Sequence, residues 1–325
     1  MRRVRVLAAT ALTATLLAAC VRPVDVDPTG TTAPGTTSST PTSTSTSERS
    51  SSSSSTTGPT LQETDLPDTL RVAISFDQPG VGLREGDTYS GLDTDVARYV
   101  ARYLGISRIT FVEGVTDQRQ TLLATGQADL VLGAYTMTPE RAEEVTFAGP
   151  YLTTGQGLLV RSRSKIRTPA DLPGFTTCSV QGSRSTAELV DNHPGLHLTM
   201  RERLSDCVDL LEDNKVNAVT SDAAILRGYA RASEAPDKLR TGGTTFTTEQ
   251  WGVAMRREDT DLCQDVRAAL ADMVDTGAWK RSVRENLGPS KAIGKRTATP
   301  PQLKACPPPR PSSSSTSGAP SPSSS

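Results

Sequence analysis

The sequence is poor in aromatic residues and has almost no histidine. Phe, Trp and Tyr make up 4% of its 325 residues, and His193 and His197 are the only imidazole side chains. No Gly-x-Ser-x-Gly, P-loop, His-Glu-x-x-His or Cys-x-x-Cys motif occurs. Histidine-based acid–base catalysis, nucleotide hydrolysis and a His- or Cys-based metal site therefore have no support in the sequence. We expect no catalytic residue, no cofactor and no metal.

The sequence also lacks an excess of charge of either sign. Its 35 Lys and Arg residues face 36 Asp and Glu residues, for a formal net charge of -1 at pH 7. Binding to nucleic acid or to an anionic membrane surface is usually accompanied by a basic excess or cluster. We therefore expect no nucleic-acid partner. Beyond residue 20, no apolar run is long enough to cross a bilayer.

The N-terminal segment has the pattern of an export signal. Basic residues at the start precede a short apolar run that ends in LAAC at residues 17–20. This ending resembles a bacterial lipobox, in which the cysteine is acylated and becomes the mature N-terminus. We therefore expect residues 1–19 to be a lipoprotein signal peptide, and Cys20 to anchor the protein to the extracellular face of the cell membrane. An ordinary secretory signal with a chance cysteine is the alternative.

Two segments are rich in Ser, Thr and Pro and poor in apolar residues. Residues 20–66 and 293–325 have this composition, which cannot bury enough surface to offset the entropy of ordering. We expect a disordered linker and a disordered tail. The chain between them has roughly 225 residues, enough for one large domain or two lobes.

This central region alternates between strand and helix patterns, which indicates α/β sheets with parallel strands. The alternation runs twice, which suggests two lobes. The expected strands are residues 70–76, 109–113, 128–134, 176–180, 196–200, 216–221 and 251–255. The expected helices are residues 93–104, 117–125, 186–192, 205–213, 222–232 and 261–276, with a short helix from residue 139. Ligands of such folds bind beyond the carboxyl ends of strands, so we expect the site residues among the first few after each strand.

A polar segment follows one of the apolar strands, at residues 133–141. Thr138 is placed to cap a helix that begins with a proline. Backbone N–H groups, the Thr136 hydroxyl and the Arg141 guanidinium would then converge on one point, and such a set of donors suits a carboxylate. The alternative is a capped helix with Arg141 paired to Glu144 or solvated.

Two other strand ends carry polar residues. Ser183 and Arg184 follow a strand and open a helix, whose N-terminus favours an anion. A plain Gly/Ser turn is the simpler explanation of that segment. Asp222 directly follows another strand, where its carboxylate can pair with a ligand ammonium, cap the next helix, or do both.

Arg119 breaks two local rules at once. It lies three and four residues before Leu122 and Leu123, so it shares their apolar face, and it falls in the first helical turn, where the helix dipole disfavours a cation. Such breaks cluster at functional sites. Arg119 is therefore a candidate for binding a ligand carboxylate in a cleft, with snorkelling to solvent as the alternative.

The order of these segments resembles the family 3 extracellular solute-binding proteins, which serve ABC transporters for polar amino acids. The resemblance covers residues 68–290. It is carried by residues 91–97 (GLDTDVA), 136–141 (TMTPER), 147–151 (FAGPY), 216–222 (VNAVTSD) and 251–254 (WGVA).

The resemblance implies a two-lobed fold of the type II periplasmic-binding-protein kind, with two crossover strands as the hinge. Lobe 1 would comprise residues 67–157 and 249–292, and lobe 2 residues 158–248. The crossovers would fall near residues 155–160 and 247–253.

The same resemblance implies roles for the candidate residues. Ala134, Thr136 and Arg141 would bind the α-carboxylate of an amino acid, Ser183 and Arg184 would close on it with backbone donors, and Asp222 would hold the α-ammonium. Within the family, residues 77–80, 118–119, 149–156 and 178–180 look most like glutamate-binding lipoproteins of high-GC Gram-positive bacteria. Arg119 then becomes the partner of the side-chain carboxylate. Ser75 supplies no charge where some relatives place a ligand-contacting one, which leaves glutamate and glutamine both open.

Export permits disulfides, and four cysteines remain after Cys20. We favour a bond between Cys178 and Cys207, because both fall in lobe 2. A bond between Cys263 and Cys306 would pin the tail, and free thiols are the alternative.

The function so implied is capture of a polar amino acid between closing lobes and its delivery to an ABC permease by a monomer. Glutamate is the expected ligand, with aspartate or glutamine as alternatives. A sensor lipoprotein that signals to a membrane partner is the second hypothesis, and an enzyme of the same fold is the third.

Overall fold

The computed structural model of the protein describes residues 67–233 and 238–308. The expected signal peptide, the expected anchor Cys20 and the linker up to residue 66 lie outside the described residues. So does the C-terminal segment from residue 309. All the described residues belong to one compact unit.

Lobe 1 is built on a five-stranded sheet. Its strand order is β5-β1-β6-β13-β7, with β5, β1 and β6 parallel to one another and β13 antiparallel to β6 and β7. These strands are β1 (Thr69–Ile74), β5 (Arg108–Glu113), β6 (Leu130–Val131), β7 (Val145–Thr154) and β13 (Glu249–Arg256). The helices are α1 (Leu92–Tyr103), α2 (Arg119–Ala124), α3 (Pro139–Glu144), α7 (Thr260–Asp275), α8 (Ala278–Leu287) and α9 (Ser290–Ile293).

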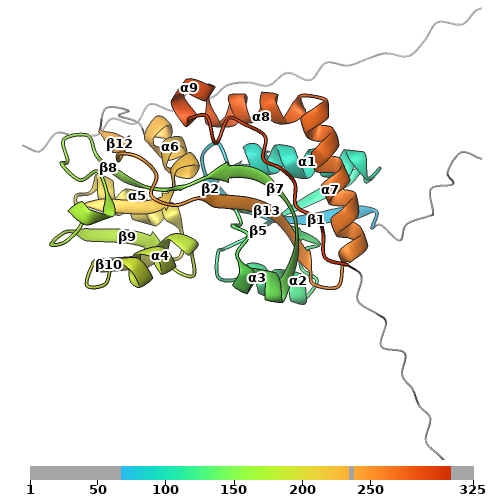
Figure 1. Ribbon diagram of the computed structural model, residues 1–325, viewed down its shortest axis with the longest axis horizontal. Coiled ribbons are helices and arrows are strands. Elements are labelled where there is room, and N and C mark those ends of the chain that lie inside the picture. The colour runs from blue at the N-terminus through green and yellow to red at the C-terminus, as the bar shows by residue number, and fades with distance from the viewer. Residues whose placement is uncertain (1–66, 234–237, 309–325) are drawn as a thin grey trace, which may run out of the picture. The chain divides into compact units, whose positions relative to one another are not determined.

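Lobe 2 repeats the plan with the intervening chain. Its sheet has the order β10-β9-β11-β8-β12, formed by β8 (Gln156–Arg161), β9 (Thr176–Val180), β10 (His197–Arg201), β11 (Ala218–Asp222) and β12 (Leu239–Thr241). The helices α4 (Arg184–Asn192), α5 (Leu204–Glu212) and α6 (Ala223–Ala232) pack on it, and a 3-10 turn spans Pro169–Asp171. Figure 1 shows this lobe on the left and lobe 1 on the right, with β7 and β13 running between them.

The two lobes are joined by two crossing segments, as predicted. β7 belongs to the first sheet and β8 to the second, so the chain crosses at Gly155; it returns between β12 and β13. The crossing segments are hydrogen-bonded to each other: the side-chain amide nitrogen Nε2 of Gln156 donates to Glu249 Oε1 at 3.1 Å. A Cβ on Gly155 would lie 2.4 Å from the carbonyl oxygen of Thr247, so only glycine allows this close approach.

The cores follow from burial of both faces of each sheet. The central strands are therefore almost wholly apolar, as in the buried stretch that ends at Leu132. On the helices, the apolar residues recur with helical spacing, as in the buried residues Val96, Ala97 and Val100 of α1. Trp251 and Trp279 are fully enclosed, and the Trp279 indole donates to the carbonyl of Tyr151.

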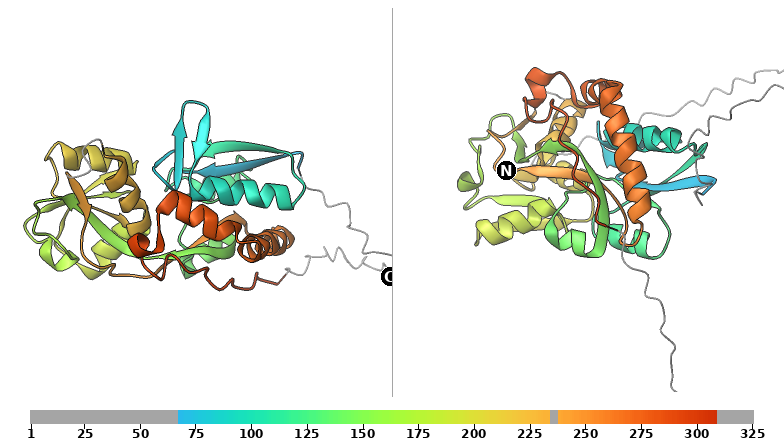
Figure 2. Two further views of the ribbon diagram at one scale, coloured as in Figure 1. Left: turned by 90° about the horizontal axis from the view of Figure 1, so that it is seen from above. Right: turned by 45° about the vertical axis from the view of Figure 1, so that its right-hand side comes forward.

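One predicted boundary is wrong. The segment after α9 was expected to be disordered from residue 293, but residues 294–308 lie against lobe 1 (Figure 2). The Lys304 N–H donates to the Gly149 carbonyl at 2.6 Å, and Cys306 forms a disulfide with Cys263 on α7. The prediction of disorder rested on the low content of apolar residues. It did not take account of the disulfide, which fixes the segment covalently.

Other elements had no counterpart in the prediction, among them the strands β7 and β12. A hairpin-like sheet of β2 (Asp77–Gln78), β3 (Gly82–Glu85) and β4 (Thr88–Ser90) follows β1, and α8 and α9 follow α7. Cys178 and Cys207 are bonded as predicted. Among the described residues, no helix has the length and apolar character needed to cross a membrane.

Candidate functional site

A cavity lies between the lobes. It is formed where the carboxyl ends of strands from both sheets face each other, the position expected for ligands of α/β sheets. The structure brings all the predicted site residues together there: Arg119, Ala134, Thr136 and Arg141 from lobe 1, and Ser183, Arg184 and Asp222 from lobe 2. Residues that had no predicted role also line it, among them Gln78, Thr116 and Ser221.

The wall from lobe 1 begins with a left-handed turn after β6. Gly133 and Ala134 have φ values of 60° and 53°, a conformation that is costly for alanine. The turn is held by Asp93 of α1, whose Oδ2 accepts the Ala134 N–H at 2.9 Å, while Oδ1 accepts the Tyr151 hydroxyl at 2.7 Å. Burial raises the pKa of Asp93 to about 6.

This geometry corrects the role expected for Ala134. Its N–H is already bonded to Asp93 within lobe 1, so its backbone can offer the cavity a carbonyl oxygen, which suits an N–H donor and not a carboxylate. Asp93 itself lay in the family motif without a role. A signal existed: it shares the buried face of α1 with Val96, Ala97 and Val100, where a carboxylate is costly unless it is hydrogen-bonded.

Two arginines of the cavity stack on one aromatic ring. The guanidinium carbons of Arg119 and Arg141 lie 5.3 Å and 4.8 Å from the ring centroid of Tyr135, which is buried. Cations are attracted to an aromatic face, so Tyr135 helps to hold two like charges in one place. No sequence pattern pointed to Tyr135.

Arg119 is buried and has no acidic partner among the residues described. Its side chain is 4% exposed, and it reaches the Gly114 carbonyl at 3.3 Å and Ser75 Oγ at 3.4 Å. Burial lowers its pKa to about 10, and the charge of Arg141 acts in the same direction. Snorkelling to solvent is therefore excluded. A buried cation without an ion pair favours an anion that enters the cavity.

Arg141 is partly buried and supports the same conclusion, an anion in the cavity. Thr138 caps α3 as predicted, since its hydroxyl accepts the Arg141 N–H. The guanidinium donates to the Thr136 carbonyl at 3.0 Å and to the Gly182 carbonyl of lobe 2 at 3.4 Å. Burial lowers the pKa of Arg141 as well. Within the described part of the chain, the expected alternative, an ion pair with Glu144, is not formed.

Asp222 is the acidic group of the cavity. It stands at the N-cap position of α6, but its side chain makes no capping bond; Oδ2 accepts instead the indole N–H of Trp251 at 2.5 Å. Burial is the main reason why its pKa is raised to about 7, and the charge of Glu249 adds to it. Trp251 lay in a family motif, yet its bond to Asp222 could not be read from the sequence, because the two residues are 29 positions apart.

The lobe 2 wall is the first turn of α4. Ser183 caps this helix, because its hydroxyl accepts the Thr186 N–H at 3.1 Å, and its own N–H donates to the Val180 carbonyl. Arg184 pairs with Glu188 one turn along the helix. The backbone donors that this turn can offer the cavity are therefore those of Arg184 and the next residue, which have no intrahelical partner.

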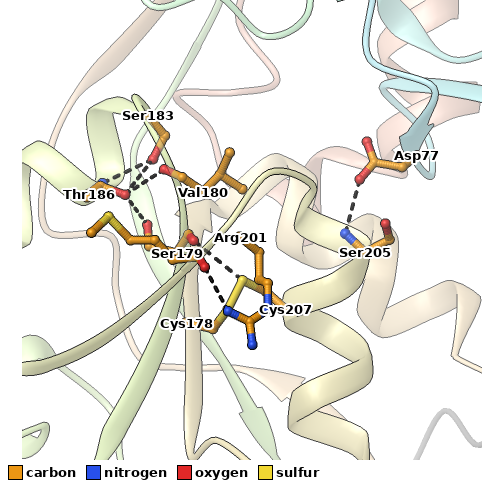
Figure 3. The surroundings of a disulfide bond; sticks show 10 residues. Asp77, Cys178, Ser179, Val180, Ser183, Thr186, Arg201, Ser205 and Cys207 are labelled. Atoms are coloured by element: carbon orange, nitrogen blue, oxygen red, sulfur yellow. Dashed lines mark hydrogen bonds between the residues drawn. A yellow bond between two sulfur atoms is a disulfide. The ribbon is translucent and has the colours of Figure 1, made fainter. Parts of the chain in front are cut away.

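The lobes contact each other around the cavity. Asp77 of lobe 1 accepts the Ser205 N–H at the start of α5 at 3.0 Å, and it also accepts the Tyr229 hydroxyl of α6. Figure 3 shows Asp77 pointing at Ser205, beside the disulfide of Cys178 and Cys207. Arg203 forms an ion pair with Glu113 across the same gap at 2.9 Å. These contacts define a closed arrangement.

Two α/β lobes, two crossing segments and a charged cavity between the lobes define a bilobal ligand-binding protein. The chain belongs to the bacterial extracellular solute-binding proteins, family 3, whose family model matches residues 70–289.

Relatives of known description agree with this membership. A glutamate-binding protein, GluB, of Corynebacterium efficiens is 37% identical over 234 residues, which are 68% of this chain and 80% of that protein. The ABC transporter glutamine-binding protein GlnH of Bacillus subtilis is 30% identical over 192 residues, 58% of this chain and 69% of that protein. A solved structure of an ancestral arginine-binding protein bound to glutamine superposes with a TM-score of 0.65 at 26% identity, over 69% of this chain and 100% of that one.

Proposed function

We propose that this protein captures L-glutamate between its lobes and delivers it to an ABC permease. The observation that carries the proposal is the charge arrangement of the cavity: two guanidinium groups that form no ion pair with the described residues, and one buried carboxylate. An α-amino acid with a second carboxylate complements all three. In this assignment Arg141 binds the α-carboxylate, with Thr136 and the first turn of α4 beside it. Asp222 binds the α-ammonium, and Arg119 binds the side-chain carboxylate.

Glutamine is the nearest competing ligand. It differs from glutamate only in a neutral amide where glutamate has the second carboxylate. The full charge of Arg119 favours glutamate, because desolvating a guanidinium without an anionic partner is costly. The relatives support both possibilities, since GluB is named for glutamate and GlnH for glutamine.

Binding, not catalysis, is the activity that the site supports. The charged groups of the cavity complement a whole zwitterion, and the described residues around it provide no nucleophile paired with a base of the kind that covalent catalysis uses. Closure of the lobes on the ligand would shift the protein to the conformation that the permease recognises.

The test is calorimetric titration of the purified protein with L-glutamate, L-aspartate and L-glutamine. We expect glutamate to bind most tightly. Arg141→Ala should weaken binding by at least about 100-fold, because it leaves the α-carboxylate desolvated without its charged partner. Arg163→Ala, an arginine that is exposed on lobe 2, is the matched control and should bind as the wild type does. Absence of binding to all three amino acids would refute the proposal.

We further infer that Cys20 carries a lipid and that the protein acts on the extracellular face of the membrane. The support is the LAAC sequence at residues 17–20. Labelling of cells with a palmitate analogue should mark the wild type and not Cys20→Ala.

The importer role is separable from the sensor alternative. Cells that lack this protein should lose uptake of labelled glutamate, and expression of the wild type should restore it. Unchanged uptake together with undiminished glutamate binding would favour the sensor.

A further inference from the structure

Gln78 presents a buried acceptor to the cavity that no group of the described chain satisfies. Its side chain is 8% exposed and lines the cavity. Its Oε1 atom has no hydrogen-bond partner. Buried polar atoms are nearly always paired in folded proteins, so an unpaired acceptor at the wall of a binding cavity points to a donor on the ligand.

The local chain explains why Gln78 holds this position. It ends the short strand β2, and its backbone carbonyl accepts the Val81 N–H at 3.0 Å. The preceding residue, Asp77, is bonded to Ser205 and Tyr229 of lobe 2. The turn is therefore fixed from both lobes when they are closed, and the amide has little freedom to seek a partner elsewhere.

The same contacts place the turn that carries Gln78 against α6, the helix that follows Asp222. The β2 turn packs on α6 through Tyr229 and through Gly228, which faces the carbonyl of Pro79. Asp222 immediately precedes α6. Arg119 enters from α2 and Arg141 from α3 of lobe 1, and Arg119 also donates to Ser75 of the segment that leads to Gln78.

We propose that Gln78 accepts a hydrogen bond from the α-ammonium of the bound amino acid, beside Asp222. This inference rests on the proposed function. An ammonium group has three N–H donors, and one carboxylate seldom takes all of them. In glutamate the ammonium is the sole source of N–H donors, because both carboxylates only accept. Gln78 thus contributes to selection for an amino acid over the dicarboxylic acid of the same length.

The experiment compares Gln78→Met with the wild type for two probes, L-glutamate and glutarate, which has the same carbon chain without the amine. Methionine keeps the shape of the side chain and removes the amide. We expect the variant to bind L-glutamate about 10- to 100-fold more weakly, the range for one hydrogen bond to a charged group. Glutarate affinity, measured by competition at millimolar concentrations, should change by less than about twofold. Gln127→Met, the same change at an exposed position, should alter neither.

The outcomes separate this inference from the function itself. If the wild type binds no amino acid, the proposed function fails. If the wild type binds glutamate and Gln78→Met binds it equally well, the inference is overturned and the function stands. The same conclusion follows if Gln78→Met loses affinity for glutamate and for glutarate to the same extent. A crystal structure of the glutamate complex decides the contact directly, since a Gln78 amide more than about 3.5 Å from the ligand nitrogen makes no hydrogen bond.

Discussion

The indole N–H of Trp251 donates to the carboxylate of Asp222 at 2.5 Å. Trp251 lies on the crossing strand β13 and belongs to the lobe 1 sheet, whereas Asp222 ends a strand of lobe 2. The acidic group of the cavity is therefore oriented at the hinge, by a side chain that is fully buried. Charge state and hinge geometry are linked at this one contact, and the proposed function adds ligand binding to it.

The first prediction concerns the pH dependence of stability. The pKa of Asp222 is raised from 3.8 to about 7 by burial and by Glu249. Between about pH 4 and pH 7 the folded state thus binds a proton that the unfolded state has released, so the free energy of unfolding falls as pH rises. Asp222→Asn cannot titrate and should lose this contribution. Chemical unfolding of both proteins without ligand, from pH 4 to pH 8, measures the difference in slope.

Glutamate affinity should change with pH in the opposite direction. The carboxylate must be ionised to attract the ammonium, so the affinity of the wild type should rise from pH 5 to pH 8. The pH profile of Trp251→Phe, which lacks the indole donor, should shift to higher pH. A wild-type affinity that is flat over this range would contradict the assignment of Asp222 to the ammonium.

The second prediction concerns closure. Gly228 lies inside α6, and a Cβ there would be 1.9 Å from the carbonyl oxygen of Pro79 in lobe 1. Gly228→Ala should therefore hold the lobes apart and weaken ligand binding by about tenfold or more, while alanine favours the helix itself. Titration calorimetry gives the affinity, and small-angle scattering with and without ligand gives the extent of closure.

A folding defect would look different. If Gly228→Ala acts only on closure, its unfolding temperature without ligand should equal or exceed that of the wild type. If the variant closes and binds normally, the Pro79 turn must move aside for the new Cβ with no loss of binding free energy, and the prediction is wrong.

The third prediction concerns ligand choice. Arg119→Gln keeps a hydrogen-bonding side chain and removes the buried charge. It should lose much of its affinity for L-glutamate, by about 100-fold, and little of its affinity for L-glutamine, whose amide needs no counter-charge. Competition titrations with both amino acids measure the change in preference. Equal losses of affinity for the two ligands would contradict the assignment of Arg119 to the side-chain carboxylate of glutamate.

The fourth prediction concerns the C-terminal segment. The disulfide of Cys263 and Cys306 joins residues that are 43 positions apart, and the chain-entropy model assigns a loop of this size about 4 kcal/mol of stability. Cys263→Ser with Cys306→Ser should lower the unfolding temperature and expose residues 294–308 to proteolysis. Glutamate affinity should stay the same, because this segment does not line the cavity. A matching loss of affinity would show that the segment also acts on the hinge.

The sequence was sufficient for much of the fold. The predicted strands and helices match the observed ones to within a few residues in both sheets, because their apolar residues recur with the spacing that burial demands. The hairpin from β2 to β4 had no prediction because its strands are short and half exposed, and α8 was missed although its apolar face is buried. The tail boundary failed because a disulfide, not composition, orders residues 294–308.

The candidate residues were found one by one from their places after strands, and Arg119 was found from two broken local rules. Their convergence on one cavity depends on the crossing segments, which bring Asp222 of lobe 2 opposite Arg119 and Arg141 of lobe 1. No local sequence pattern encodes this arrangement of residues from two lobes. Asp93 and Tyr135 act through partners on other elements, and Gln78 stands out because its amide oxygen has no partner among the described residues. Neither property is visible until the chain is folded.

The types of element, the family resemblance and the charged groups available for a ligand could all be predicted from the sequence, since these depend on periodicity and on residue type. Tertiary structure alone decided which charges lack a partner, which carboxylate is buried at the hinge and which amide acceptor is unpaired. The physical reason is that desolvation and hydrogen-bond satisfaction depend on all the neighbours of a group, and most of those neighbours are distant in the chain.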